Sequence, residues 1–346
     1  MRSFLKPAAG LVSLVALACA GCSSGGGGAS DAASPRSGGT HTAPAPSRSD
    51  SPSSATSYAP YVSATTASAT DSSGSPSTYN LAFVISDGSA CTPKWNGTYA
   101  LGDSAVASRI SALKKSGASV RVSFGGASGK ELASTCDSAS ALAAAYGAAL
   151  DAAGSSQADF DIEGDELADS DSVALRSEAI ALLQKERTDL EVSFTLPVMP
   201  SGLDDDSLAL LESANDHAVK VSTVDIMTMN YGSSYAGDMG DYAITSAEAA
   251  HDQLEDVFGL SSAGAWRGLA LTSMIGVNDV DNETFTLSDA AQVRAFAEEK
   301  EVAWVSMWST FRDRRCVDGD ADSDDAATDC SGVKQSSGAF AKALAG

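Results

Sequence analysis

Short apolar runs rich in β-branched residues alternate with Ala-rich stretches of helical character along most of this chain. Such alternation is typical of repeated βα units around a parallel sheet. The sequence predicts strands at 58–66, 79–85, 120–124, 158–163, 190–196, 221–230, 268–275 and 302–309. It predicts helices, several with Ser or Asp at the N-cap, at 103–116, 138–153, 172–186, 207–215, 246–258, 288–300 and 338–345. The expected fold class is therefore α/β, as one (β/α)8 TIM barrel over residues 58–346, a length that suits this fold.

The first predicted strand is followed by 67–77, a stretch rich in Ser, Thr and Ala. This composition indicates an extended loop rather than a helix. If residues 58–66 form no strand, seven strands remain and the barrel is open.

The start of the chain has the features of an export signal. Two basic residues, Arg2 and Lys6, precede the apolar stretch 8–18, and small residues then lead to Cys22. We interpret residues 1–21 as a signal peptide, because the apolar stretch is too short to span a bilayer. Cys22 resembles the lipid-attachment cysteine of a bacterial lipoprotein, and simple cleavage with release of the chain is the alternative.

Residues 22–57 consist mainly of Gly, Ser, Ala, Thr and Pro. A segment of this composition cannot bury enough apolar surface to offset its ordering entropy, so a flexible, disordered linker is expected. With a lipid on Cys22, the linker would hold an extracellular domain close to the membrane. Without the lipid, the protein would be secreted.

The chain is strongly acidic, with a formal net charge of −23 over 346 residues. Such a charge disfavours nucleic acid and anionic lipid as partners, because both carry the same sign. It is compatible with a neutral partner such as a polysaccharide.

Six cysteines are present, and two of them lie in or beside the predicted leader. The other four are Cys91, Cys136, Cys316 and Cys330. An even number of cysteines in an exported chain predicts disulfides. Pairing Cys316 with Cys330 would close a short acidic loop and contribute roughly 3 kcal/mol, and Cys91 would then pair with Cys136. A zinc site is disfavoured and no metal is expected, because the sequence has no Cys-x-x-Cys spacing and its three histidines are scattered.

Three carboxylates occupy alternate positions of the fourth predicted strand. Asp159, Asp161 and Glu163 share one face of this strand, and Phe160 and Ile162 share the other. If the apolar pair packs outward against helices, the acids face the barrel interior, where unpaired charge is costly. The pattern predicts an active site in which one carboxyl group has a raised pKa and acts as a general acid. The alternatives are an edge strand with an acidic solvent face, or a calcium loop that lacks its twelfth-position acid.

This run resembles the Asp-x-Asp-x-Glu signature of glycoside hydrolase family 18, the chitinases and endo-β-N-acetylglucosaminidases. Three further motifs agree with that family in order, namely Ser123-Phe124-Gly125-Gly126, Met229-Asn230-Tyr231 and Trp308. Longer runs resemble a bacterial and archaeal chitinase-like branch, among them Leu81-Ala82-Phe83-Val84 and Met274-Ile275-Gly276-Val277-Asn278-Asp279. The resemblance covers nearly all of residues 58–340.

The resemblance implies a retaining, substrate-assisted mechanism, without metal or cofactor, on chitin or N-acetylglucosamine oligosaccharides. Glu163 would be the acid and later the base, and the substrate's own acetamido oxygen would be the nucleophile. Asp161 would orient the acetamido group and Asp159 would hold Asp161. Tyr231 would hydrogen bond to the acetamido carbonyl, and Trp308 would form the floor under the sugar.

Other motif residues are expected to contribute to substrate binding, namely Ser123, Gly125, Gly126, Met229 and Asn230. The chain departs from the family pattern at Gly232, where many chitinases have Asp. Asn230 could supply a polar contact instead, although strand alternation would point it to the opposite face.

Several alternatives stay open at this point. The same residues would serve an endo-β-N-acetylglucosaminidase acting on glycans or a glycosidase acting on wall polymers. A non-hydrolytic sugar-binding protein could use the same scaffold, although such proteins usually lack the acid that Glu163 provides. The aspartates between Cys316 and Cys330 could bind calcium, but a solvated loop is favoured. The enzyme is expected to be a monomer.

Overall fold

A parallel β-sheet forms the centre of the protein, which is described by a computed structural model over residues 56–317 and 329–346. Seven strands follow one another as parallel neighbours in this part of the chain, in the order β13-β10-β9-β8-β7-β6-β3. Their bounds are β3 Thr78–Ser86, β6 Ser119–Gly125, β7 Gln157–Asp161, β8 Glu191–Pro197, β9 Val221–Met227, β10 Leu269–Met274 and β13 Trp304–Trp308. The expected α/β fold with a parallel sheet is confirmed.

The first predicted strand is present as two short pieces rather than as one run. β1 (Ser57–Tyr58) pairs with β13, and β2 (Tyr61–Ser63) pairs with β3. Pro60 lies between the pieces and has no N–H group to donate to a ladder. The ladder is therefore interrupted where a single closing strand was expected.

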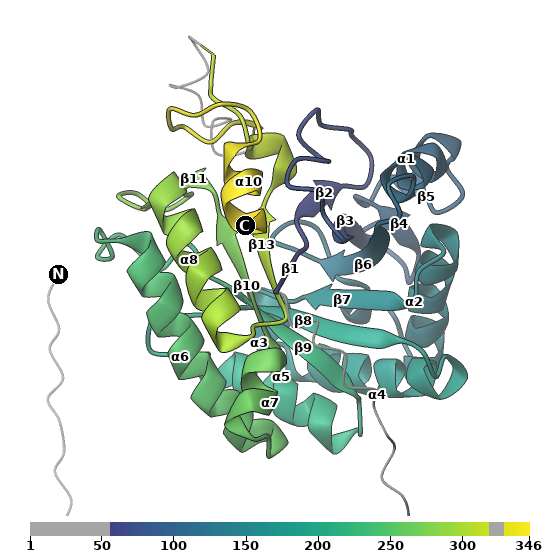
Figure 1. The fold of residues 1–346 in the computed structure, drawn as a ribbon. Helices are drawn as coiled ribbons and strands as arrows, with labels where there is room; N and C mark the ends of the chain where they lie inside the picture. Colours follow the sequence, from purple (N-terminus) through teal and green to yellow (C-terminus); the bar gives the residue numbers. More distant parts are fainter. Residues whose placement is uncertain (1–55, 318–328) are drawn as a thin grey trace, which may run out of the picture. The chain divides into compact units, whose positions relative to one another are not determined.

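Helices follow most strands and pack along the outer side of the sheet (Figure 1). The longer ones are α1 Ser104–Lys114, α2 Ala139–Ala153, α4 Ser170–Glu186, α5 Asp205–Asp216, α6 Met239–Phe258, α8 Leu287–Lys300 and α10 Ala339–Ala345. The side chains of Asp103, Ser138 and Asp204 accept hydrogen bonds from backbone N–H groups at three of the helix starts. These caps confirm the predicted use of Ser and Asp at helix N-termini.

Small elements that the sequence did not predict lie in the loops between strands and helices. They are β4 Pro93–Trp95, β5 Tyr99–Ala100, β11 Gly276–Val277, β12 Thr284–Phe285, α3 Asp165–Ala168, α7 Ser262–Arg267 and the 3-10 turns η1 Leu132–Ser134 and η2 Thr310–Arg312. Elements of two to six residues are too short to show a hydrophobic period.

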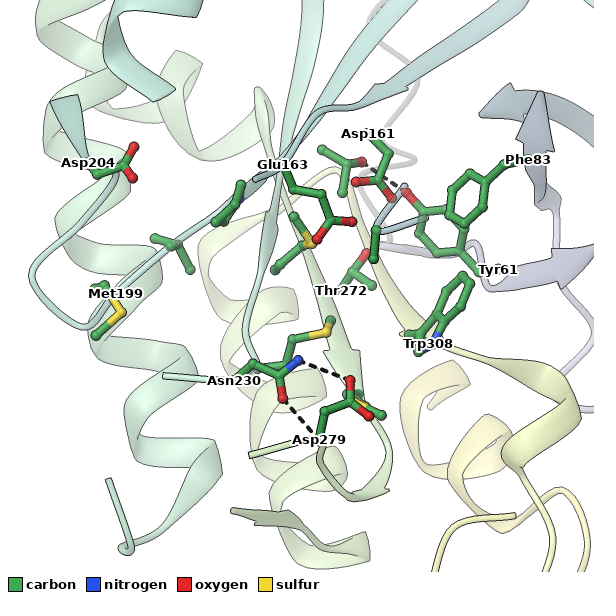
Figure 2. Close-up of a pocket in the computed structure, with 17 residues that line it drawn as sticks. Tyr61, Phe83, Asp161, Glu163, Met199, Asp204, Asn230, Thr272, Asp279 and Trp308 are labelled. Atoms are coloured by element: carbon green, nitrogen blue, oxygen red, sulfur yellow. Dashed lines mark hydrogen bonds between the residues drawn. The ribbon is translucent and has the colours of Figure 1, made fainter. Parts of the chain in front are cut away.

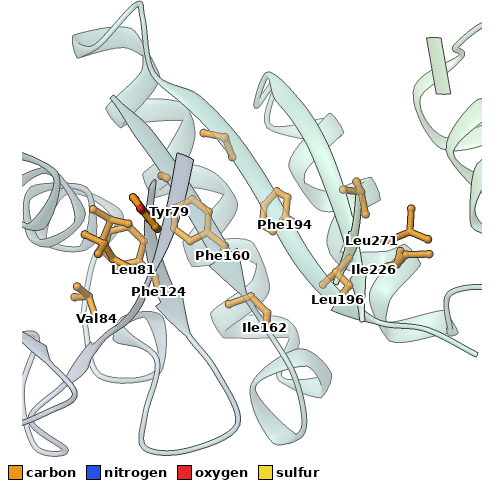
Figure 3. Packing of buried hydrophobic residues seen from close by; sticks show 14 of the residues in the cluster. Tyr79, Leu81, Val84, Phe124, Phe160, Ile162, Phe194, Leu196, Ile226 and Leu271 are labelled. Atoms are coloured by element: carbon orange, nitrogen blue, oxygen red, sulfur yellow. The ribbon is translucent and has the colours of Figure 1, made fainter. Parts of the chain in front are cut away.

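Aromatic side chains pack between the sheet and its helices (Figure 3). The ring of Phe160 stacks on Phe124 at 5.3 Å and lies 5.6 Å from Phe194, and all three are almost fully buried. Ile162 is also fully buried. Burial of one such side chain contributes about 1.5–3 kcal/mol, so a register slip on β7 would be costly. This packing holds the alternate residues of β7 on the opposite face, as the sequence predicted.

Both predicted disulfides are present. Cys91 pairs with Cys136 at a Cα–Cα distance of 4.5 Å, and Cys316 pairs with Cys330 at 5.1 Å. The leader, Cys22, most of the linker and most of the acidic loop lie outside the described residues. No helix in the described part of the chain is long and apolar enough to cross a membrane.

Candidate active site

A cavity of about 280 Å³ opens at the carboxyl ends of the strands (Figure 2). The described residues that line it are Tyr61, Phe83, Ala127, Asp161, Glu163, Thr195, Pro197, Val198, Met199, Asp204, Met227, Met229, Asn230, Thr272, Met274, Asp279 and Trp308. Asp161 and Trp308 are the last residues of β7 and β13. In parallel α/β folds this end of the sheet is where active sites form.

Asp159 lies beneath the cavity and is 1% exposed. Its Oδ2 accepts hydrogen bonds from Tyr61 at 2.9 Å and Ser123 at 2.7 Å. Its Oδ1 accepts hydrogen bonds from Ser193 at 2.8 Å and Thr195 at 2.9 Å. Four hydroxyl groups from three strands, β2, β6 and β8, therefore compensate for the burial of this side chain and fix its position.

Asp161 lies above Asp159 and borders the cavity together with Glu163. Burial raises the pKa of Asp161 well above its usual value, and the neighbouring carboxyl groups of Glu163 and Asp159 raise it further. Burial also raises the pKa of Glu163, a hydrogen bond with Asp161 lowers it in part, and Asp279 adds a smaller upward contribution. A buried and a half-buried carboxyl group side by side cannot both ionise cheaply, so the Asp161–Glu163 pair holds a proton at a pH where ordinary carboxyl groups have lost theirs.

Two glycines allow β6 to approach β7 closely. Gly125 has φ +100°, and a Cβ atom there would lie 2.1 Å from the carbonyl oxygen of Asp161. Gly126 donates its N–H to the same oxygen at 2.9 Å, and a Cβ atom there would lie 2.6 Å from the ring of Phe83. Neither glycine nor the fully buried Ser123 is among the lining residues. The structure therefore gives all three a supporting position, which corrects the prediction that they bind substrate directly.

Trp308 borders the cavity at the end of β13, where the sequence placed it. Its ring stacks on Phe83 at 5.5 Å with an interplanar angle of 19°, and the ring of Tyr61 meets it edge-on at 5.7 Å. The three rings form an aromatic wall that can pack against the apolar face of a sugar. Sequence reasoning missed Tyr61 and Phe83, although Phe83 lies in one of the runs that resemble chitinases.

Tyr231 does not reach the cavity, which corrects its predicted catalytic position. It is 3% exposed, its ring packs beside Tyr235 and Tyr242, and its hydroxyl group accepts a hydrogen bond from Ser246 at 3.4 Å. Met229 lines the cavity instead. Because β9 ends at Met227, strand alternation no longer decides which way the later side chains point.

Asn230 lines the cavity, although strand alternation had assigned it to the opposite face. It has φ +54°, a left-handed conformation that Asn tolerates better than most residues. Its Nδ2 donates to Asp279 Oδ2 at 3.3 Å, and the backbone N–H of Asp279 donates to Asn230 Oδ1 at 3.2 Å. This turn accounts for both positions, because it places Asn230 in the cavity wall, as its predicted role in substrate binding requires, and Tyr231 outside it.

A second buried carboxyl group, Asp225, lies beneath the cavity and was not predicted. Its Oδ2 accepts hydrogen bonds from Thr272 at 2.7 Å and from Trp304 Nε1 at 3.1 Å. Burial raises the pKa of Asp225 to about 7, and Asp159 adds to this effect. The guanidinium group of Arg121 lies 3.9 Å from the centre of the Trp304 ring. The sequence signal for this group is an Asp between the apolar residues Val224 and Ile226 of β9.

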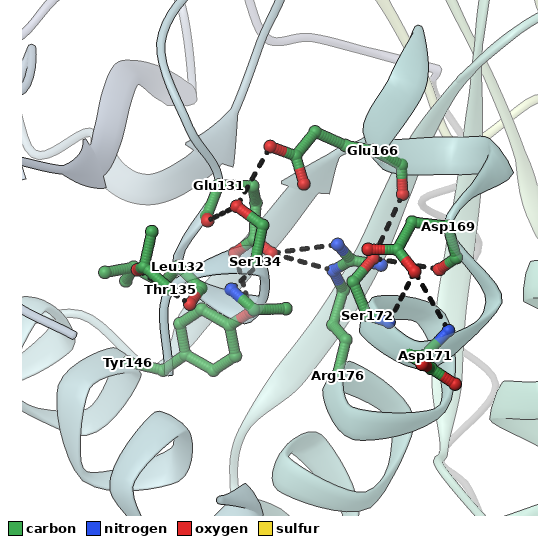
Figure 4. Close-up of polar contacts among 11 residues, drawn as sticks. Glu131, Leu132, Ser134, Thr135, Tyr146, Glu166, Asp169, Asp171, Ser172 and Arg176 are labelled. Atoms are coloured by element: carbon green, nitrogen blue, oxygen red, sulfur yellow. Dashed lines mark hydrogen bonds and ion pairs between the residues drawn. The ribbon is translucent and has the colours of Figure 1, made fainter. Parts of the chain in front are cut away.

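A buried ion pair ties together the loops around the acid pair (Figure 4). Glu131 Oε2 accepts hydrogen bonds from Arg176 Nη2 at 2.8 Å and Nε at 3.1 Å, and Glu131 Oε1 accepts one from Tyr146 at 2.6 Å. Ser134 Oγ donates to Glu166 Oε1 at 3.0 Å, in the segment that follows the candidate acid. The loop after β6 is thereby fixed to α4 and to the loop after β7.

A scan against protein-family models finds no match. Among curated proteins, the chain is 34% identical over 187 residues to a probable bifunctional chitinase/lysozyme of Escherichia coli, and the match covers 51% of this chain and 21% of that protein. It is 32% identical over 186 residues to endochitinase 11 of Metarhizium anisopliae, covering 51% of this chain and 35% of that protein. The matches thus span about a fifth and a third of these relatives.

Among solved structures, the chain resembles active domain 2 of a thermostable chitinase from Pyrococcus furiosus in complex with chito-oligosaccharides. The identity is 26%, the TM-score is 0.72, and the match covers 84% of this chain and 93% of that one. A chitinase from Chromobacterium violaceum, of glycoside hydrolase family 18, shares the fold at 14% identity and a TM-score of 0.54, over 84% of this chain and 82% of that one. These similarities confirm the resemblance to the chitinases of family 18.

Proposed function

We propose that this chain, which is similar to chitinases of glycoside hydrolase family 18, is a chitinase-type glycosidase that hydrolyses β-1,4 linkages of N-acetylglucosamine polymers or oligomers. The observation that carries the proposal is the position of the acids. Asp159 lies buried beneath the cavity, while Asp161 and Glu163 border it together with an aromatic wall that includes Trp308. The names of the similar proteins support the same reaction.

The proposed mechanism is retaining and substrate-assisted, an exception to the scheme with two catalytic carboxylates. Glu163 donates its proton to the glycosidic oxygen as the bond to the anomeric carbon breaks. The acetamido oxygen of the same sugar attacks that carbon, and a cyclic oxazolinium ion forms. Asp161 accepts a hydrogen bond from the acetamido nitrogen and stabilises the positive charge. Glu163 then takes a proton from the incoming water, which opens the ring with net retention.

The geometry of the acid pair fits the two roles of Glu163. The raised pKa keeps a proton available for the first step, since a general acid works best when its pKa lies near the operating pH. Asp159, held by four hydroxyl groups, is close enough to Asp161 to raise the pKa of that carboxyl group. Tyr231 has no role in this mechanism, because it packs away from the cavity.

We also propose that the sheet is an eight-stranded (β/α)8 barrel whose first strand is divided. The two pieces of this strand support the proposal, because β1 bonds to β13 and β2 bonds to β3, the two ends of the parallel series. The hydrogen bonds from Ala59 N to Val305 O at 3.0 Å and from Asn80 N to Pro60 O at 3.0 Å continue these contacts through the break.

The chain is further proposed to be exported and anchored outside the cell by a lipid on Cys22, with residues 22–57 as the tether and the catalytic domain acting as a monomer. The two disulfides support export, because such bonds persist in oxidising environments. The test is expression of the full chain in a bacterial host with radiolabelled palmitate. The wild type should carry the label and Cys22→Ala should lose it, whereas an unlabelled wild type would indicate release without an anchor.

The activity is tested with defined N-acetylglucosamine oligomers and the variant Glu163→Gln, which keeps the shape of the side chain. Loss of the general acid should lower kcat by about 10²–10⁴-fold, while calorimetric binding of the oligomers persists. Asp281→Asn is a matched control, because Asp281 is exposed and does not line the cavity. A wild type that binds oligomers but releases no product between about pH 4 and pH 8 would identify a sugar-binding protein instead.

A further inference from the structure

The wall of the cavity has a uniform sign of charge. Four acids line it, namely Asp161, Glu163, Asp204 and Asp279, and among its described lining residues there is no Lys, Arg or His. A site of this kind attracts cationic groups and repels anionic ones. The question is which of these acids is free to bind a part of the substrate other than the reacting sugar.

Two of the acids belong to the proposed chemistry, and a third is engaged in the fold. Asp161 lines the cavity and its buried Oδ1 has no hydrogen-bond partner among the described residues, so the proposed mechanism pairs this carboxyl group with the acetamido group of the reacting sugar. Asp204 is the N-cap of α5, and its Oδ1 accepts the backbone N–H of Ser207 at 2.8 Å. Asp279 is therefore the acid without an assigned role.

The segment that carries Asp279 is held rigidly from behind. Arg312 is fully buried, and its Nη2 donates to the carbonyl oxygens of Ile275 at 3.0 Å and Val277 at 2.6 Å. Asn278, 5% exposed, donates from Nδ2 to the carbonyl oxygens of Met274 at 2.9 Å and Gly276 at 3.0 Å. These bonds fix the backbone that ends at Asp279.

The loop after β9 supports Asp279 from the side. Asn230 exchanges two hydrogen bonds with it, at 3.2 and 3.3 Å. The backbone N–H of Gly232 donates to Glu283 Oε1 at 2.7 Å, which joins the same two loops a second time. Oδ2 of Asp279 takes the bond from Asn230, and within the described residues Oδ1 takes none. A fixed carboxylate with a free oxygen thus lies in the wall of the cavity that Glu163 also lines (Figure 2).

We infer that Asp279 is a specificity-determining residue that binds the sugar on the leaving side of the cleaved bond and favours an ammonium group over a carboxylate there. The inference rests on the proposed function. The reacting sugar must keep its acetamido group, because that group is the nucleophile, so a change of charge is tolerated only on a neighbouring sugar. Glu163 must contact the leaving oxygen, and Asp279 lines the same cavity and is close enough to raise the pKa of Glu163. The preferred substrate class is therefore partially deacetylated chitin rather than a polymer that contains muramic acid.

The test compares three oligomers of equal length. One is fully N-acetylated, one has a single glucosamine on the leaving side of the bond, and one alternates N-acetylglucosamine with N-acetylmuramic acid. Asp279→Asn removes the charge but keeps an oxygen for Asn230 Nδ2 and the backbone N–H for Asn230 Oδ1. Asp281→Asn makes the same chemical change two residues away, at an exposed position outside the cavity wall.

In the wild type and in Asp281→Asn, kcat/KM should be about 5- to 10-fold higher for the glucosamine oligomer than for the acetylated one, as expected for a hydrogen-bonded, partly exposed ion pair. In Asp279→Asn this ratio should fall close to one, and cleavage of the muramic acid oligomer should improve. An effect on Glu163 would change the rates of all three oligomers equally, so the ratios report binding of the leaving sugar alone.

The possible outcomes separate this inference from the proposed function. If the wild type cleaves none of the oligomers, the proposed function fails. If it cleaves the acetylated oligomer and Asp279→Asn leaves the glucosamine ratio unchanged, only the role of Asp279 is wrong. A wild type that prefers the muramic acid oligomer would overturn the inference as well. The glucosamine preference should also weaken as salt is added, because the contact is electrostatic.

Discussion

Replacing Asp225 with Asn is expected to make the stability of this protein less dependent on pH. Burial raises the pKa of Asp225 from 3.8 to about 7 in the folded chain, with Asp159 adding to the effect. Between these two values the folded chain holds a proton that the unfolded chain has released. The stability from this proton is fully present below pH 3.8 and is lost as the pH rises to about 7.

The size of the effect follows from the pKa difference. About three pKa units correspond to about 4 kcal/mol over the whole range, and about 3 kcal/mol of this is lost between pH 5 and pH 8. An Asn side chain can accept the same hydrogen bonds, which Thr272 and Trp304 donate at 2.7 and 3.1 Å. Its NH2 group would replace Oδ1, which is buried without a partner among the described residues. Asn therefore imitates the protonated acid at every pH.

The measurement is urea unfolding of the wild type and of Asp225→Asn at about pH 5 and about pH 8. The wild type should lose about 3 kcal/mol more than the variant between the two pH values. Buried carboxyl groups on which Asp225 has no effect, such as Asp313, whose pKa burial also raises, titrate equally in both proteins and cancel in the comparison. Asp281→Asn should behave like the wild type. Equal pH dependence in the wild type and Asp225→Asn would refute the reasoning.

Three further predictions follow from the contacts described above. Arg176→Met leaves the buried carboxylate of Glu131 without its ion pair, so the free energy of unfolding, measured in urea, should fall by about 3–5 kcal/mol. Adding Glu131→Gln removes the unpaired charge and should restore part of the lost stability. Burial mainly raises the pKa of Glu163 and Asp279 adds to it, so Asp279→Asn should move the basic limb of the pH profile of kcat/KM to lower pH. Trp308→Ala removes the centre of the aromatic wall and should lower kcat/KM for N-acetylglucosamine oligomers by about 10- to 100-fold. Trp308→Phe keeps an aromatic ring there and should retain part of the wild-type kcat/KM.

The sequence predicted those parts of the site that depend on local periodicity. The orientation of Asp159 and Asp161 follows from alternation within β7, because Phe160 on the other face is anchored among aromatic rings. The position of Trp308 follows in the same way, because it ends a strand. The order of strands and helices was also predictable, because most of these elements are long enough to show their period.

The errors arose where a distant contact decides the conformation. The family resemblance placed Tyr231 in the site, and strand alternation would have pointed Asn230 to the opposite face, yet Asn230 lines the cavity and Tyr231 does not. The left-handed turn at Asn230 is held by two hydrogen bonds to Asp279, 49 residues further along the chain. The alternation of side chains along β9 contains no information about a contact so distant in the sequence. Asp225 escaped notice for the same reason, because its neighbours Thr272 and Trp304 come from β10 and β13.

The acids of this site connect stability with the proposed activity. Burying Asp161 and Glu163 in one cavity disfavours their charged forms, so the folded chain is most stable when a proton remains on the pair. That proton is the one that the proposed reaction transfers to the leaving sugar. Asp159 lies just as deep, but four hydroxyl donors compensate for its burial. The hydroxyl groups of β2, β6 and β8 thus hold Asp159 by hydrogen bonds. Asp161 Oδ1 has no such donor among the described residues, so in the proposed reaction the substrate supplies a hydrogen-bond donor to Asp161. A variant that gave Asp161 a hydrogen-bond donor of its own should therefore be more stable and less active, because the group that stabilises the acid would occupy the place of the acetamido nitrogen.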